Sequence, residues 1–149
     1  MATHASEGSA PWESTQRTYE GFPLYLRRPI GLDFDSLSTK FPVHLTVSHE
    51  FSFRRFDGAP EPSYNSGLEE FDVAVTRYFS GSRDGQVVLV ETFGGTRHYY
   101  FYVAPSVTVD SVLADLRARY PGYRLEAEAR ADPSWNFIRR YTAEYLGEA

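Results

Sequence analysis

The order of apolar and polar positions along the chain predicts strands that alternate with helices. Over residues 43–53 the side chains alternate between apolar and polar, which is typical of a strand with one face on a core. Residues 86–93 and 97–104 are strongly apolar and flank a Gly-Gly pair, which predicts a hairpin. Residues 123–130 alternate again, and this pattern predicts a further strand.

Apolar residues at helical spacing predict helices over residues 68–79 and 109–120. Ser66 and Glu69 have the spacing of a capping box, so we expect the first of these helices to begin there, after a loop. A third helix is expected near the C-terminus, with Asp132 as its N-cap and proline in its first turn.

The N-terminal part of the chain carries weaker signals. Residues 14–19 and 22–28 predict a hairpin around a Glu-Gly turn. Residues 31–41 fit either a short helix or an irregular crossover, and residues 1–11 are expected to be a flexible tail. With 149 residues, the remainder, residues 12–149, fits one α+β domain.

Residues 43–130 therefore have the order β-α-β-β-α-β, which is the ferredoxin-like pattern. This pattern predicts a four-stranded antiparallel sheet in the order 4-1-3-2, with both helices on one face. The N-terminal hairpin and the C-terminal helix would be additions to it.

A sheet with helices on one side leaves its other face to be covered or used. Alternation along the first and third of these strands predicts that His44, Glu50, His98, Tyr100 and Tyr102 point to that open face. We therefore expect the two tyrosines and two histidines to contact a partner, with Glu50 contributing charge.

Three interpretations of this face stay open. The C-terminal helix could cover it, since its apolar residues exceed one narrow stripe. A protein partner or a second copy could bind it, because tyrosine is enriched at interfaces. Nucleic acid is disfavoured, because the formal net charge is −5 and no RNP-like aromatic run is present.

Composition and motifs exclude several kinds of chemistry. The chain has no cysteine, which removes thiol catalysis and disulfides. His44 and His49 point to opposite faces of one strand, so no metal site is expected from them, and no nucleotide-binding or hydrolase motif is found. We expect no cofactor. No run is long enough to span a membrane and no secretory signal is present, so the expected location is the cytoplasm.

Several features resemble the bacterial family catalogued as domain of unknown function 695. They are Trp12 near the start, the Asp-Gly-Ala-Pro of residues 57–60, the aromatic strand after Gly95, and the Asp-Pro-Ser-Trp of residues 132–135. The resemblance covers nearly the whole chain. A looser similarity to regulator of ribonuclease E activity B domains implies an acidic adaptor or inhibitor.

The sequence thus predicts a non-enzymatic protein-binding module, with homodimerisation as one form of it. The alternative is a small-ligand binder or an enzyme that uses histidine and glutamate in a pocket between the sheet and the C-terminal helix.

Overall fold

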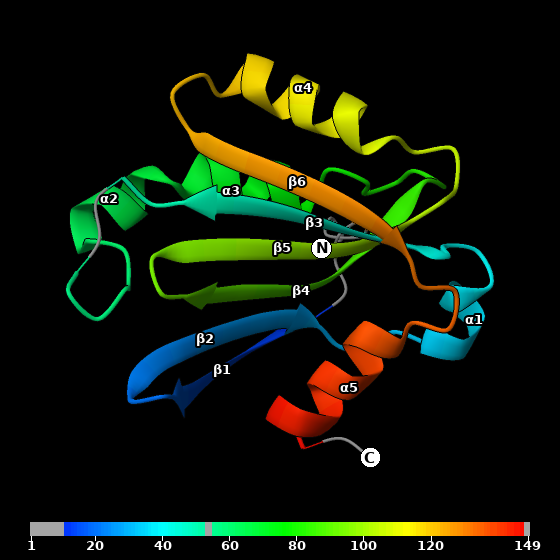
Figure 1. The fold of residues 1–149 in the computed structure, drawn as a ribbon, viewed down its shortest axis with the longest axis horizontal. Coiled ribbons are helices and arrows are strands. Elements are labelled where there is room, and N and C mark those ends of the chain that lie inside the picture. The colour runs from blue at the N-terminus through cyan, green and yellow to red at the C-terminus, as the bar shows by residue number, and fades with distance from the viewer. Residues whose placement is uncertain (1–10, 53–54, 148–149) are drawn as a thin grey trace, which may run out of the picture.

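A six-stranded antiparallel sheet forms the centre of the protein (Figure 1). The computed structural model describes residues 11–52 and 55–147, so almost all of the expected tail lies outside the described residues. The strands are β1 (Trp12–Tyr19), β2 (Phe22–Pro29), β3 (Val43–Glu50), β4 (Gly85–Phe93), β5 (Thr96–Val103) and β6 (Arg124–Ala131). The helices are α1 (Phe34–Ser38), α2 (Pro62–Gly67), α3 (Glu69–Thr76), α4 (Val109–Arg119) and α5 (Asn136–Tyr145). The predicted α+β class is confirmed.

The strands are ordered β1-β2-β4-β5-β3-β6 across the sheet. Within this series, β6-β3-β5-β4 is the 4-1-3-2 order expected for the strands after residue 43. The N-terminal hairpin continues the same sheet, because β2 pairs antiparallel with β4 from Tyr25 to Arg27. Consequently β1, and not β4, is one edge of the sheet.

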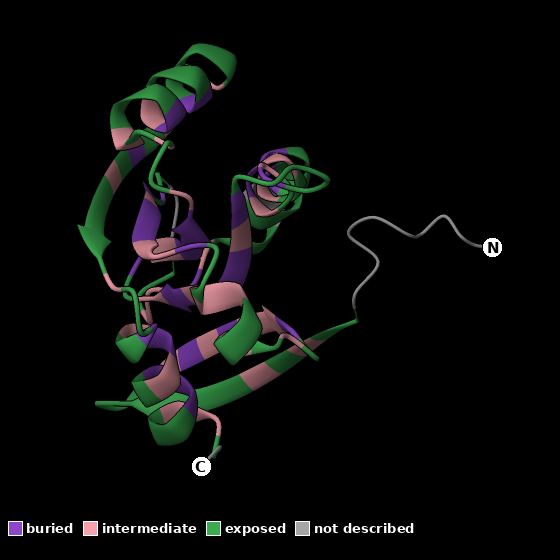
Figure 2. Ribbon diagram, turned by 90° about the vertical axis from the view of Figure 1, so that its right-hand side faces the viewer, coloured by how far each residue is buried: buried purple, intermediate pink, exposed green. Residues whose placement is uncertain are grey.

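Helices α3 and α4 cover one face, as predicted. Phe71 and Val75 of α3 and Leu116 of α4 pack in one apolar cluster with Leu45 of β3 and Phe101 of β5. Burial of these side chains is the main driving force that holds the helices on the sheet. Figure 2 shows buried residues along the central strands, between the helices.

The opposite face is also covered, so the expectation of an open face is wrong. A second cluster joins Trp135, Ile138 and Tyr141 of the C-terminal segment to Tyr100 and Tyr102 of β5. Strand β4 has a register shift between residues 87 and 89. As a result, Val88 and its neighbour Leu89 both point to this face and join the second cluster. Of the three interpretations, coverage by the C-terminal helix is the one found.

Two local predictions need correction. The expected loop before α3 is helix α2, and Ser66 Oγ donates to the carbonyl of Pro62 (3.3 Å) instead of capping α3, which has no side-chain cap. Helix α5 begins at Asn136, yet Asp132 does cap it, since its carboxylate accepts from the N–H groups of Asn136 and Phe137, both at 3.0 Å. The preceding Trp135 has a left-handed backbone conformation (φ 59°), and its indole is fully buried between the helix and the sheet.

The two tryptophans provide a matched test of this packing. Trp135 is fully buried, and its Nε1 donates to the carbonyl of Phe41 (2.7 Å), whereas Trp12 is 37% exposed. We expect Trp135→Ala to lower the free energy of unfolding by about 3–5 kcal/mol, because it leaves a cavity and an unpaired carbonyl. Trp12→Ala should cost less than about 1 kcal/mol. Urea denaturation at low protein concentration measures both, and equal losses would contradict this assignment.

Candidate functional site

The five side chains predicted to form a binding face do not form one. His44, Tyr100 and Tyr102 are 6%, 9% and 0% exposed, because α5 lies over them. The His44 ring stacks on Phe137 with centroids 4.4 Å apart, and Tyr102 stacks on Trp135 at 4.2 Å. The alternation that aimed these rings at one face was predicted correctly, but their exposure was not.

Glu50 and His98 remain accessible but do not meet. Glu50 lies near Arg124 of β6, with Oε2 3.6 Å from Nη1. The carboxylate beside His98 is Glu91, which is its cross-strand partner in β4. Sequence reasoning missed Glu91, although the register of the Gly-Gly hairpin would have placed it opposite His98.

Glu91 is the polar anchor between α5 and the sheet. Its Oε1 accepts from the hydroxyl of Tyr100 (3.0 Å), and its Oε2 accepts from the hydroxyl of Tyr141 on α5. Burial and the nearby Glu91 charge raise the pKa of both tyrosines, so they stay protonated donors. A second carboxylate does the same at the other end, where Tyr102 donates to Asp132 Oδ2 (2.7 Å).

Ser48, His98 and Glu91 lie on three adjacent strands in the order of a nucleophile, a base and an acid. Ser48 Oγ is 2.8 Å from His98 Nδ1, but His98 Nε2 is 3.9 Å from Glu91 Oε1, which is too long for a hydrogen bond. Both Glu91 oxygens already accept from tyrosines. The arrangement therefore lacks the oriented base that serine activation needs.

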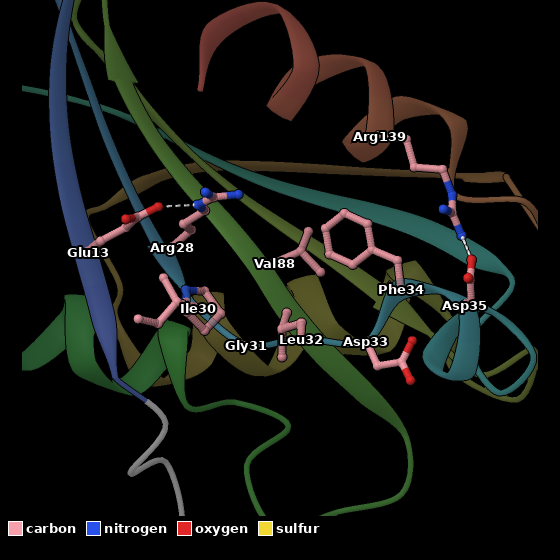
Figure 3. A pocket seen from close by; sticks show the side chains of 11 residues that line it. Glu13, Arg28, Ile30, Gly31, Leu32, Asp33, Phe34, Asp35, Val88 and Arg139 are labelled. Atoms are coloured by element: carbon pink, nitrogen blue, oxygen red, sulfur yellow. Dashed lines mark hydrogen bonds and ion pairs between the residues drawn. The ribbon is translucent and has the colours of Figure 1, made fainter. Parts of the chain in front are cut away.

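A pocket of about 510 Å³ lies between the end of β2, the segment before α1, and α5 (Figure 3). Its place corresponds to the alternative prediction of a site between sheet and C-terminal helix, but its described lining contains no histidine. Arg28 pairs with Glu13 at 2.5 Å and Arg139 pairs with Asp35 at 2.9 Å, so each arginine is already neutralised. Phe34 and Val88 lie between the two ion pairs.

A second pocket, of about 550 Å³, opens on the α3 side of the sheet beside the hairpin. Arginines from three different segments line it, namely Arg27, Arg55 and Arg97. None of its described lining residues is acidic. Asp72 of α3 lies beneath, where Arg27 donates to both of its oxygens at 3.0 and 2.7 Å and Tyr99 donates at 2.8 Å.

Asp72 stays ionised in this position. Burial pushes the pKa of Asp72 upward, but the hydrogen bonds and charge of Arg27, with Tyr99 and Arg97, outweigh it and hold the pKa below its usual value. One half-buried carboxylate thus faces two guanidinium groups. The convergence of these arginines is not visible in the sequence, because it depends on the register of β2, β4 and β5 and on the position of the segment before α2.

Two features are absent from residues 11–52 and 55–147. No group of three or more His, Asp or Glu residues there is placed to hold an ion. Among the same residues, no helix combines the length and the apolar character needed to cross a bilayer.

The chain belongs to a family of unknown function, DUF695, whose model matches residues 10–141. The resemblance drawn from the sequence is thereby confirmed for nearly the whole chain. Neither the curated proteins nor the solved structures contain a significant match.

The low pKa of two buried histidines, His44 under α5 and His49 beside Phe71, predicts a loss of stability in mild acid. Burial lowers the pKa of both His44 and His49 from 6.5 to about 4. Between these values the unfolded chain binds a proton that the folded chain does not, so stability falls as the pH falls, by up to about 3 kcal/mol for each histidine. In His44→Phe, which preserves ring stacking, we expect a smaller loss between pH 6.5 and 4, measured by urea denaturation across that range. An unchanged pH profile would contradict a neutral buried His44.

A further prediction concerns the Glu91 anchor. Glu91→Gln should lower the free energy of unfolding by about 1–3 kcal/mol, because two charge-assisted hydrogen bonds from Tyr100 and Tyr141 are weakened. Glu126→Gln on β6 is the matched control, with little expected change. Thermal denaturation compares them, and similar stabilities for the two variants would argue against the anchor.

Proposed function

We propose that this protein acts by binding protein, and that its partner is a second copy of the same chain paired along the edge of β1. The aromatic face expected to do this is covered by α5. The observation that carries the proposal is the pattern of β1 itself, an exposed edge strand whose charges complement a second β1.

The backbone of β1 has one row of groups directed away from the sheet. A two-residue Glu20-Gly21 turn joins β1 to β2, so Tyr19 and Phe22 form the first hydrogen-bonded pair of the hairpin. Pairs then alternate, and the bond from Ile30 N to Pro11 O (2.9 Å) fits this alternation. The even-numbered residues, 12 to 18, therefore direct their N–H and C=O groups outward, and β1 pairs only with β2 among the described strands.

The side chains of β1 are complementary in an antiparallel pair centred on Thr15. Residues whose numbers add to 30 would then face each other, which brings outward-directed Ser14 and Gln16 into a hydrogen-bonded pair. Glu13 would face Arg17 of the second copy, and this opposite-charge contact would occur twice. Both side chains lie on the α5 side of the sheet, since Glu13 pairs with Arg28 and Arg17 Nε donates to the carbonyl of Tyr145 (3.1 Å).

The other edge of the sheet is less suited to the same association in the register centred on its own middle residue. A pair of β6 strands centred on Ala127 would place Arg124 opposite Arg130 and Glu126 opposite Glu128. Like charges directly opposite each other destabilise a strand pair, and charged edge strands are a common defence against pairing. Because β1 has no such pattern and also exposes Trp12, it is the edge suited to association.

We also infer that residues 43–131 are a ferredoxin-like unit. Its strand order β6-β3-β5-β4, and the placement of α3 and α4 on one face, support this topology. In this interpretation the added hairpin moves the sheet edge outward from β4 to β1, and α5 closes the second face. Both additions then favour association at β1. The hairpin supplies the exposed edge strand, and α5 covers the aromatic rings that could otherwise bind a partner.

Light scattering coupled to size-exclusion chromatography tests the dimer. The wild-type chain should behave as a concentration-dependent dimer. Gln16→Pro removes one outward N–H and should weaken the dimer tenfold or more, whereas Gln16→Ala retains that N–H and should leave it unchanged. A monomer at all concentrations, or equal behaviour of these two variants, would contradict the proposal.

Charge exchange tests the register. Arg17→Glu and Glu13→Arg should each weaken self-association, because each creates two like-charge contacts. Mixed together, the two variants should form a heterodimer in which every contact is Glu opposite Arg. Arg124→Glu on β6 should change nothing. Failure of the mixture to associate, with both variants folded by circular dichroism, would rule out the pairing centred on Thr15.

A further inference from the structure

We propose that the pocket lined by Arg27, Arg55 and Arg97, hereafter the arginine pocket, binds a small organic anion that carries a carboxylate or a phosphate ester. Its lining includes Ser14, Thr15 and Gln16 of β1, so the site adjoins the proposed dimer edge, but the three arginines lie on other segments. It differs from the pocket beside α5 in that its described lining residues include no carboxylate.

The arginine pocket has an excess of positive charge on a protein of net charge −5. Arg27 takes both oxygens of Asp72, and Arg97 Nη1 is 3.5 Å from the same Oδ1, so one negative charge faces two positive ones. Arg55 has its own partner, with Nη2 2.9 Å from Asp57 Oδ2. In these ion pairs, three arginines face two aspartates, which leaves one positive charge for a ligand to balance.

Arg97 is held in place before any ligand arrives. Its side chain is 11% exposed, its Nε donates to Thr92 Oγ1 (2.8 Å), and its guanidinium lies over the Phe51 ring at 5.3 Å. Its Nη2 donates to Asn65 Oδ1 (3.4 Å), which ties it to α2. A cation fixed by packing and hydrogen bonds loses little entropy on binding, so it favours an anion more than a mobile surface arginine does.

Arg55 lies on a segment docked against the β4–β5 hairpin. Gly58 accepts from Gly95 N (2.8 Å), and a Cβ on Gly58 would lie 2.8 Å from Gly94 Cα, so only glycine allows this close approach. Arg55 Nη2 bonds Asp57, but its side chain is 49% exposed and can turn to a ligand. The arginine pocket thus combines one fixed cation with one adjustable cation.

The other lining groups define the class of anion. Tyr25, Leu26 and Pro60 offer apolar surface, and Thr92 and Asn65 offer polar atoms. A volume of about 550 Å³ lies within the range of small-molecule sites. The guanidinium group of arginine can donate two parallel hydrogen bonds to the oxygens of a carboxylate or a phosphate. A bare inorganic ion would leave the apolar part of the wall uncovered, so we expect an organic group attached to the anion.

Isothermal titration calorimetry with benzoate and phenyl phosphate tests this site, with benzyl alcohol as the neutral probe. At least one anion should bind the wild-type chain, and the alcohol should not. Arg55→Met and Arg27→Met should each weaken the binding about tenfold or more. Arg119→Met is the matched control, since Arg119 is also half-exposed and pairs with an aspartate, Asp115, but lies outside the arginine pocket. Its affinity should equal that of the wild type.

Amide chemical shifts then locate the bound anion. They should move at Thr15, Asn65 and Thr92 in the wild type and move less at the same anion concentration in Arg55→Met, a substitution at a side chain that is 49% exposed. The dimer variant Arg17→Glu should bind as well as the wild type, which separates this site from the association. No binding of either anion at millimolar concentration, or equal affinity in the wild type and Arg55→Met, would overturn the proposal.

Discussion

The packing of the C-terminal segment on β5 is the constraint on which the rest of the structure depends. Trp135 is fully buried against Tyr102, and its indole N–H reaches the carbonyl of Phe41, so one side chain ties α5 to the sheet and to the segment before β3. A buried aromatic ring with a satisfied donor stabilises such a contact strongly. Because this contact covers His44, Tyr100 and Tyr102, those three side chains are not available to a partner.

Covering an aromatic face that carries hydroxyls requires acceptors beneath the helix. Asp132 and Glu91 supply them, one at the start of α5 and one below Tyr141. A buried hydroxyl without a partner costs free energy, so the two carboxylates stabilise the covered face together with the rings. His98, a candidate site residue in the sequence, thus lies beside a structural network that includes its cross-strand partner Glu91.

The N-terminal hairpin extends the sheet beyond the helices of the α3 side, and this extension generates both proposed sites. It supplies β1 as an exposed edge, and it carries Arg27 to Asp72 of α3. The arginine pocket forms where the hairpin, the β4–β5 turn and the segment before α2 meet. Edge and pocket are therefore neighbours with separate chemistry: backbone pairing with charge complementarity in one, and guanidinium groups in the other.

Local pattern determined much of this protein by itself. Period-two alternation in β3, the Gly-Gly turn and helical periodicity in α4 predicted the class and the face to which His44 and Tyr100 point. These features depend on neighbours in sequence, whose geometry is set by strand and helix repeats. Tertiary structure alone decided that α5 covers those rings, that Glu91 and not Glu50 lies beside His98, and that three arginines converge. Such outcomes depend on contacts between residues distant in the chain, such as Trp135 with Phe41 and Arg27 with Asp72, and no periodicity encodes them.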